Sequence, residues 1–407
     1  EAVAYLKKYQ AKKIGFDLKH WLRGTNNVQL LGQAMAEGFE LASYEFSKYK
    51  KIDKDSHHLD IKELYIYSTP AQKNAWQKGW QTGQLMSQGV KLARDLVNEP
   101  AGTMTPTFLA EEAKKIAQLS KNIRLRILER EQIEKLGMGA YLAIAKGSTE
   151  EPKFIHLVYH PGGRVKDKIA LVGKGVTFDS GGLNIKPWEN MQQMKIDMGG
   201  AASVLGIFSA LDALKPKVEV HGIIAACENM PSGQSVKPGD VVRNMQGKTI
   251  EIAHTDAEGR VTLSDSLAYA QKQGIKKIVD IATLTGSIIV ALGPEYAGLF
   301  ANKQKLANEL LKSATIVGEN IWQLPLAPEY KDLDKSQVAD YRNIPSMKMA
   351  GSITAAWFLA HFIKDDVDWA HIDIAGPVYA EKSYNSYTPI GGVGFGVRTI
   401  LEWLKNL

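Results

Sequence analysis

One segment of the chain combines charged side chains with glycines at a place where α/β proteins bind ligands. The sequence VGKGVTFDSGG occupies residues 172–182, directly after a predicted strand, and contains Lys174 and Asp179. Lys186 and Asp197 follow shortly after it. Glycines let a backbone approach a ligand closely, and ligands in open α/β sheets collect at the carboxyl ends of the strands. The segment is therefore a candidate site for chemistry that needs carboxylates and ammonium groups.

A second segment, HTDAEGR at residues 254–260, holds two acids and a guanidinium close together. It lies between an apolar strand predicted for residues 249–253 and an amphipathic helix. We expect an extended segment, in which alternate residues share one face, so that Asp256, Glu258 and Arg260 point the same way. Two carboxylates this close repel each other unless a cation lies between them. The alternative is that the acids sit at the start of the helix, where its cap and dipole favour them.

Any one of these acids or lysines could cap a helix or form an ordinary ion pair. Four carboxylates and two lysines at predicted strand ends, flanked by glycines, make that explanation weaker for the group as a whole. The sequence contains neither an HExxH motif nor a GxSxG nucleophile elbow. Its one cysteine, Cys227, excludes an intrachain disulfide and a multi-thiolate zinc site. Because Cys227 lies in an apolar strand, we expect a small core residue there.

Composition and periodicity predict an α/β protein. Hydrophobic residues make up 44% and charged residues 23% of the 407 residues, which is ordinary for a globular chain. Helical and strand patterns alternate after residue 100, and this alternation favours a largely parallel central sheet sandwiched by helices. The predicted helices cover residues 107–119, 131–136, 201–214, 261–273, 303–317 and 397–404. The predicted strands cover residues 123–128, 154–159, 169–172, 218–227, 249–253, 278–284 and 369–374.

The amino-terminal part is predicted to be a separate, shorter region. It is rich in lysine, with helical spacing in residues 28–48, a strand at residues 61–67 and a helix at residues 72–97. We place the boundary so that residues 1–85 form an amino-terminal region with a linker helix. Residues 86–407 then form the α/β domain.

Several motifs closely resemble those of the leucyl aminopeptidase (cytosol aminopeptidase, M17) family. The motifs are GKGVTFDSGG, NIKP, KIDMGGAA and HTDAEGR, together with NEPAGTMTPT, ENMPSGQSVKPG, ATLTG and HIDIAGP. They occur in the family's order from about residue 90 to the carboxyl terminus. The resemblance before that point is weak. The resemblance of the later motifs implies that residues 86–407 are a dinuclear metal aminopeptidase catalytic domain.

Carried over position by position, the resemblance implies metal ligands and two catalytic residues. The ligands would be Lys174, Asp179, Asp197, Asp256 and Glu258, and the catalytic residues Lys186 and Arg260. Asp179 and Glu258 would bridge the two ions, and Asp256 would bind mainly the more exchangeable one. Lys174 and Asp197 would complete the other, with Lys174 as a neutral amine because an ammonium cannot ligate. Two divalent cations balance four carboxylates, and this ligand set suits Zn²⁺ or Mn²⁺, and also Mg²⁺ or Co²⁺.

The resemblance further implies a metal-dependent exopeptidase that releases N-terminal amino acids, leucine and other apolar residues preferred. Water activated by two metal ions would attack the scissile carbonyl, while one ion binds the free α-amine. Lys186 would stabilise the oxyanion, and a bicarbonate ion at Arg260 would shuttle the proton. Family positions that line the pocket for the first side chain hold Met194, Thr283, Leu284, Gly286 and Ala375.

Partners and location follow from the same resemblance and from composition. The family implies peptide substrates with a free amino terminus, a homohexamer and a cytoplasmic location. One cysteine fits a reducing compartment. Lys and Arg exceed Asp and Glu by only 6, which is weak support for nucleic-acid binding. The chain has no uncharged run long enough to span a membrane.

Other functions stay open at this point. A two-metal phosphoesterase would use the same kind of metal pair with Lys and Arg. A DNA-binding regulatory relative and a catalytically inactive scaffold are the further alternatives, although every catalytic and ligand position of the family is filled. One residue departs from the family's motif: His254 stands where the family has Asn. It could be a core residue, a hydrogen-bond partner of a ligand carboxylate or an extra ligand, and we favour a hydrogen bond to a carboxylate or to the loop backbone.

Overall fold

The computed structural model describes residues 5–6, 12–22, 27–51, 63–163, 165, 167–347 and 349–407. Its centre is a sheet of eight strands. These are β3 (Ile123–Leu128), β4 (Lys153–Tyr159), β5 (Lys168–Asp179), β6 (Glu219–Asn229), β9 (Lys277–Ala282), β10 (Ala297–Ala301), β11 (Ile321–Gln323) and β13 (Asp368–Asp373). Their order across the sheet is β11-β10-β13-β9-β5-β6-β4-β3.

The central strands β13, β9, β5 and β6 run parallel, whereas β10, β4 and β3 join the sheet in antiparallel pairings. The predicted α/β class with a large central sheet is therefore confirmed, and its parallel part is the middle. Parallel strands end at one common edge, so their carboxyl ends can contribute side chains to one site.

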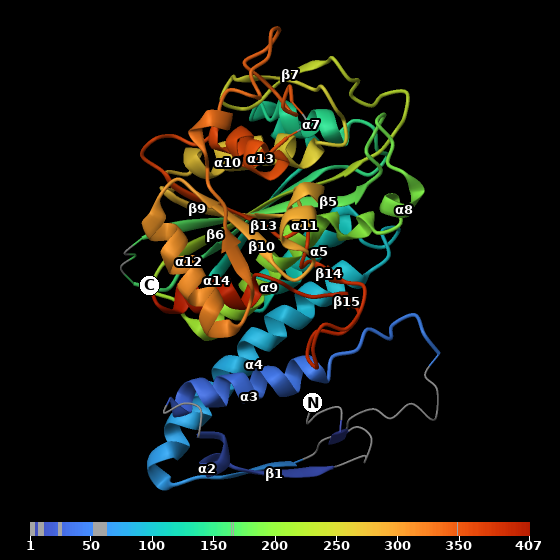
Figure 1. Ribbon diagram of the computed structural model, residues 1–407. Coiled ribbons are helices and arrows are strands. Elements are labelled where there is room, and N and C mark those ends of the chain that lie inside the picture. The colour runs from blue at the N-terminus through green and yellow to red at the C-terminus, as the bar shows by residue number, and fades with distance from the viewer. Residues whose placement is uncertain are drawn as a thin grey trace.

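Helices cover both faces of the sheet, as Figure 1 shows, and bury its apolar side chains in two core clusters. One layer contains α4 (Pro70–Asn98), α5 (Pro106–Gln118), α9 (Gly199–Leu214), α12 (Gln304–Val317) and α14 (Val397–Lys405). The other contains α6 (Arg130–Lys135), α7 (Gly139–Ala145), α10 (Glu258–Lys272) and α13 (Gly351–Ala360). Cys227 is fully buried in the second cluster, as expected.

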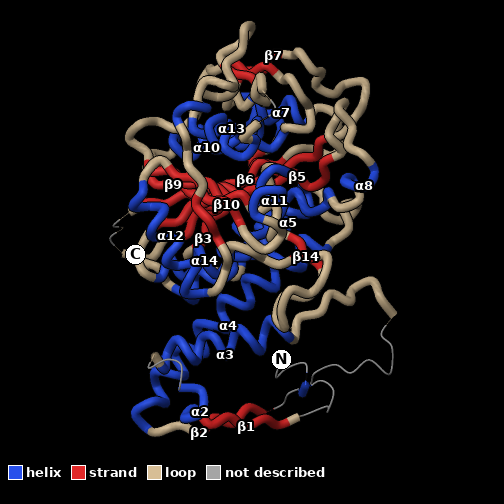
Figure 2. The backbone as a smooth tube through the Cα atoms, viewed as in Figure 1, coloured by secondary structure: helices blue, strands red, loops and turns tan. Residues whose placement is uncertain are grey.

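The amino-terminal region projects from this body (Figures 1 and 2). Helix α3 (Val28–Ala42) lies along α4, and β1 (Lys13–Asp17) pairs in parallel with β2 (Glu63–Tyr67). A Cβ atom at Gly79 would lie 1.8 Å from the Gln29 carbonyl oxygen, so the two helices touch backbone to backbone. Helix α4 runs unbroken through residue 85 and packs on α9, which joins this region to the main body.

Short elements complete the chain. They are α2 (Leu18–Trp21), α8 (Trp188–Met191), η2 (Met194–Met198), α11 (Gly286–Leu292) and η3 (Pro328–Tyr330), with strands β7 (Val241–Arg243), β8 (Thr249–Glu251), β12 (Tyr341–Arg342), β14 (Tyr379–Ala380) and β15 (Gly391–Gly392). The stretch Met194–Leu214 is apolar and long enough to cross a membrane, but 78% of its most apolar window is buried in the fold. It is a core helix with the 3-10 turn η2 before it.

Strand β5 is longer than predicted and carries the first candidate motif. The prediction ended it at residue 172, where the apolar run meets Gly173. Gly173 and Gly175 instead lie within the strand, where a Cβ atom at Gly173 would lie 2.7 Å from the Gly200 carbonyl oxygen. Close approach of two backbones is therefore the reason for glycine at residue 173.

We predict that Gly200→Ala strongly destabilises the protein. A Cβ atom there would lie 1.9 Å from the Ile281 carbonyl oxygen and 2.8 Å from the Lys174 nitrogen. Neither backbone atom can yield, so α9 must shift from the sheet, and we expect the free energy of unfolding to fall by about 3 kcal/mol. Urea unfolding followed by circular dichroism measures it. Gly38→Ala in α3, where no atom lies within 4 Å of the added Cβ, is the control and should be neutral or stabilising.

Candidate active site

A cavity of about 900 Å³ opens at the carboxyl edge of the central sheet. It is lined by every site residue that the sequence analysis named: Lys174, Asp179, Lys186, Met194, Asp197, Asp256, Glu258, Arg260, Thr283, Leu284, Gly286 and Ala375. They come from β5 and the loop after it, from η2, from α10 and the turn before it, and from the segments that follow β9 and β13, including the start of α11. The fold thus brings together residues that are up to 201 positions apart in the chain, from Lys174 to Ala375.

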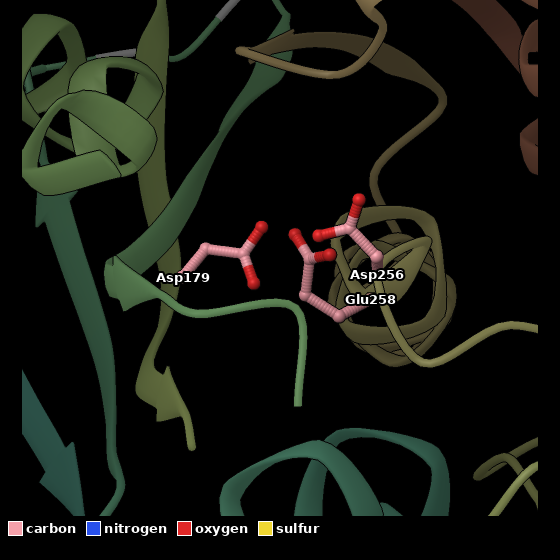
Figure 3. Close-up of side chains that lie close together, drawn as sticks. All are labelled: Asp179, Asp256 and Glu258. Atoms are coloured by element: carbon pink, nitrogen blue, oxygen red, sulfur yellow. The ribbon is translucent and has the colours of Figure 1, made fainter. Parts of the chain in front are cut away.

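Three carboxylates converge in this cavity. Asp179 is the last residue of β5, directly after an irregularity in its pairing with β6 between Val176 and Phe178. Figure 3 shows its carboxylate facing those of Asp256 and Glu258, which approach from the start of α10. Each of the three offers an oxygen within 4.8 Å of the others. This spacing suits a shared cation.

The second motif is not the extended segment that we expected. Residues 254–257 form a turn, and α10 begins at Glu258, so Glu258 and Arg260 belong to its first helical turn. The alternation argument was therefore wrong. The alternative was right in placing an acid in the first helical turn, where the dipole favours it, but the residue before the helix, Ala257, provides no side-chain cap. The carboxylates converge because the turn folds Asp256 back towards Glu258.

Lys174 is buried among acids. Its Nζ lies 2.7 Å from Asp197 Oδ1 and 2.8 Å from Glu258 Oε1, and it donates to the Thr283 carbonyl at 2.9 Å. Burial opposes its charge, but the surrounding carboxylates outweigh burial and raise its pKa above the usual range. Glu258 is affected in turn. Burial favours its neutral form, yet the positive charges of Lys174 and Lys186 hold its pKa below the ordinary value.

Lys186 reaches the other side of the acidic group. Its Nζ lies 2.8 Å from Asp179 Oδ2 and 2.5 Å from Asp256 Oδ1. Burial lowers and these carboxylates raise its pKa, and the carboxylates prevail. Lys186 is therefore a charged group at the rim of the carboxylate cluster.

The residues present fit divalent cations. Burial raises the pKa of Asp179, Asp197 and Asp256, so each carboxylate needs positive charge nearby to stay ionised. Asp197 Oδ2 is buried and accepts no hydrogen bond from the described residues. Such an unpaired buried acceptor is costly unless a cation or another donor meets it.

Arg260 is a buried cation without a counter-ion in direct contact. It is 8% exposed, lines the cavity and makes no hydrogen bond or ion pair to any residue that the structure describes. Burial lowers its pKa to about 10, while Glu258, Asp373 and Asp334 favour its charge. Arg260 therefore stays charged at neutral pH and is free to meet an anion.

Sequence reasoning missed residues that hold the motifs in place. Asp373 ends β13 and accepts from the backbone nitrogens of Leu284 and Ala375, so it holds two pocket segments. Asn343 accepts from the His254 nitrogen and donates to the His254 carbonyl. Asp373 lies in the HIDIAGP motif and could have been named from it, whereas no local signal marks Asn343.

His254 contacts the turn and not the cavity. Its Nδ1 accepts from the backbone nitrogen of Asp256 at 3.3 Å. His254 is not among the residues that line the cavity. Because the segment is not extended, His254 does not share a face with Asp256 and Glu258 as predicted. Its hydrogen bond nevertheless places it next to the backbone of Asp256, whose carboxylate lines the cavity.

The chain is similar to known proteins over most of its length. A model described as the cytosol aminopeptidase family, catalytic domain, matches residues 91–401. A probable cytosol aminopeptidase of Alkaliphilus oremlandii is 48% identical over 380 residues, 93% of this chain and 75% of that protein. One from Aquifex aeolicus is 47% identical over 376 residues, 92% of this chain and 74% of that protein.

Two solved structures share the fold. A tomato leucine aminopeptidase variant has a TM-score of 0.89 and 41% identity, with 100% of this chain and 77% of that chain covered. The bottromycin maturation enzyme BotP has a TM-score of 0.89 and 36% identity, with 100% of this chain and 85% of that chain covered.

Gly259→Ala tests the arrangement around Lys174. A Cβ atom at residue 259 would lie 2.4 Å from Lys174 Cε and 2.6 Å from its Nζ. The lysine must move away from Asp197 and Glu258, and we expect divalent-metal affinity to fall about 10-fold or more. Titration calorimetry with Zn²⁺ or Mn²⁺ measures this affinity. An unchanged affinity would show that the position of Lys174 does not matter for metal binding.

Proposed function

The chain belongs to the cytosol aminopeptidase family, and from that premise we propose how this site acts. Members of the family are metal-dependent exopeptidases, and this protein is such a hydrolase. We infer that it binds two divalent ions, Zn²⁺ or Mn²⁺ with Mg²⁺ and Co²⁺ as further candidates, and removes apolar N-terminal residues. The convergence of Asp179, Asp256 and Glu258 within 4.8 Å carries this proposal.

The proposed ligands are Lys174, Asp179, Asp197, Asp256 and Glu258. By the family resemblance, Asp179 and Glu258 would be shared by both ions. The unpaired Asp197 Oδ2 supplies a free acceptor beside Lys174. Bound divalent ions lower the pKa of water and polarise a carbonyl. The protein's part is to hold the ligands in a desolvated cavity, where electrostatic interactions are stronger than in water.

Lys186 is the proposed oxyanion-stabilising group. It projects between Asp179 and Asp256, and the surrounding acids keep it protonated. A fixed ammonium beside the reacting carbonyl stabilises the negative charge that develops in the transition state. Because it is positioned by the fold, it needs little reorganisation during the reaction.

The proposed pocket for the first side chain is formed by Met194, Thr283, Leu284, Gly286 and Ala375, which line the cavity. Its largely apolar lining supports leucine-like first residues. We propose that the substrate's free α-amine is bound at the metal site, which sets the register at the end of the peptide. Arg260, which lacks an acidic partner among the described residues, would hold a bicarbonate ion that moves a proton.

The remaining proposals concern the whole protein. We propose that residues 1–85 act as an amino-terminal region and linker, and residues 86–407 as the catalytic domain. A homohexamer in the cytoplasm fits the family and the naming of the relatives as cytosol aminopeptidases.

The test is metal analysis of the purified protein together with hydrolysis of aminoacyl anilides. We expect two ions per chain, rapid hydrolysis of leucine anilide, no hydrolysis of its N-acetyl derivative, and loss of activity with a chelator. Phenyl phosphate is the control for phosphoesterase activity. Full activity of metal-free protein, or cleavage of the blocked substrate, would contradict the proposal.

Asp256→Ala and Lys186→Ala should separate ligation from catalysis. Asp256→Ala removes a proposed ligand, so metal content and rate should both fall. Lys186→Ala should keep both ions while kcat falls by roughly 10²–10³, the usual effect of losing one oxyanion donor. Metal content by mass spectrometry and anilide kinetics decide between the two roles. Loss of metal in Lys186→Ala would make Lys186 part of the metal site.

Lys174→Arg should lose one ion per chain. Arginine keeps the charge but does not deprotonate, so it cannot ligate. In the wild type, ligation must displace a proton from Lys174, whose pKa the acids raise. Metal affinity should therefore fall as the pH is lowered. Calorimetry in buffers of different ionisation enthalpy counts the released protons. Two ions retained in Lys174→Arg would leave Lys174 as an ion-pairing residue only.

A further inference from the structure

The loop that carries Lys186 has no regular secondary structure, yet it is tied down by hydrogen bonds. It begins after β5 and closes on itself, because the Lys186 nitrogen donates to the Ser180 carbonyl at 2.9 Å. Gly181 and Gly182 have φ angles of +86° and +63°, which favour glycine. A Cβ atom at Gly182 would lie 3.1 Å from Thr255 Oγ1 and 2.8 Å from Asn229 Oδ1. The loop thus lies directly against the HTDAEGR turn.

Thr255 is the contact point on that turn. It is fully buried, and its hydroxyl donates to the Gly181 carbonyl at 2.6 Å while accepting from the Asn184 nitrogen at 2.8 Å. In return, the Thr255 nitrogen donates to Asn184 Oδ1 at 2.8 Å. The backbone nitrogen of each residue therefore donates to the side chain of the other. Asn184 stands two residues before Lys186, so these bonds hold the loop close to that lysine.

Asn229, at the end of β6, ties the same turn to Asp179. Its Nδ2 donates to Asp179 Oδ1 at 2.8 Å and to the Thr255 carbonyl at 3.0 Å. Asn229 is 2% exposed, so these bonds lie in a desolvated place. The strand end, the HTDAEGR turn and the Lys186 loop form one hydrogen-bonded unit.

We propose that Thr255 and Asn184 are positioning residues that fix Lys186 over the carboxylates. This inference rests on the proposed function, in which Lys186 stabilises the oxyanion. Lysine has a long flexible side chain, and its ion pairs to Asp179 and Asp256 alone do not fix the backbone that carries it. The reciprocal bonds of Thr255 hold that backbone at a set distance from the turn that carries Asp256.

Removing the hydroxyl should therefore loosen the loop. Thr255→Val keeps the volume but leaves the Asn184 nitrogen and the Gly181 carbonyl without a partner in a buried place. Misplacement of a reacting group by about 1 Å can cost about 10²-fold in rate. We expect kcat for leucine anilide to fall about 10–100-fold, with KM changed less than about 3-fold, and both ions retained. Thr255→Ser keeps the hydroxyl and should recover most of kcat.

Hydrogen exchange gives a readout that needs neither metal nor substrate. The Asn184 amide loses its acceptor in Thr255→Val, so amides of residues 181–186 should exchange about 10-fold faster in metal-free protein. Thr177→Val is the matched control. Thr177 is equally buried on β5, and its hydroxyl donates to the Cys227 carbonyl at 3.3 Å and to no other described residue, so the loop of residues 181–186 should exchange as in the wild type.

A double-mutant cycle shows whether the effect passes through Lys186. In the Lys186→Ala background, Thr255→Val should lower kcat by less than about 2-fold, because the group that it positions is gone. An undiminished effect there, unchanged exchange at residues 181–186, failure of Thr255→Ser to restore kcat, or loss of metal in Thr255→Val would each overturn the proposal.

A second variant and the activity of the wild type complete the test. Should Thr255→Val not fold, Asn184→Ala removes the other half of the reciprocal pair on a half-buried residue, and the same kinetic and exchange outcomes apply to it. Should the metal-loaded wild type fail to cleave leucine anilide, the proposed function fails. Wild-type cleavage with an unaffected Thr255→Val overturns the positioning role alone.

Discussion

The need to compensate carboxylates that are held close together in a largely buried place is the constraint on which the site depends. Burial first, and then the neighbouring acids, raise the pKa of Asp179 and Asp197, so these groups need cations nearby to stay ionised. Lys174 lies between Asp197 and Glu258, and Lys186 lies between Asp179 and Asp256. The two lysines thus divide the acids into two pairs. Everything else near the cavity serves to keep these groups at fixed separations.

The fold meets this constraint by placing the charged groups on rigid ends of strands and helices. Asp179 ends β5, Glu258 begins α10, and Asp197 lies in η2 directly before α9. Helix α9 comes close enough to the sheet only because Gly173 and Gly200 carry no side chain. Gly173 and Gly200 therefore bring the backbones of β5 and α9 together, and so they set the distance between Lys174 and its acids.

Sequence reasoning named residues that the fold brings to one cavity, and it predicted most of the elements, but not how the second motif folds. Helices and strands with strong periodicity, such as α9 and β6, were predicted within a few residues. Short strands such as β10 and β11, and the small helix α11, gave too little pattern to be predicted. Asp256, Glu258 and Arg260 were expected to converge by strand alternation, whereas a turn and a helix start bring them together.

Under the proposed metal site, charge complementarity would leave two cations of the cavity available to other partners. With Lys174 neutral, two divalent ions would balance the four carboxylates, and the charges of Lys186 and Arg260 would remain. Both line the cavity, and with the four carboxylates balanced by metal their positive charges would be uncompensated. Arg260 has no hydrogen bond or ion pair to the described residues even before metal is considered, and its pKa of about 10 keeps it charged. A cavity with such an excess attracts anions, which suits a reaction that develops an oxyanion at its centre.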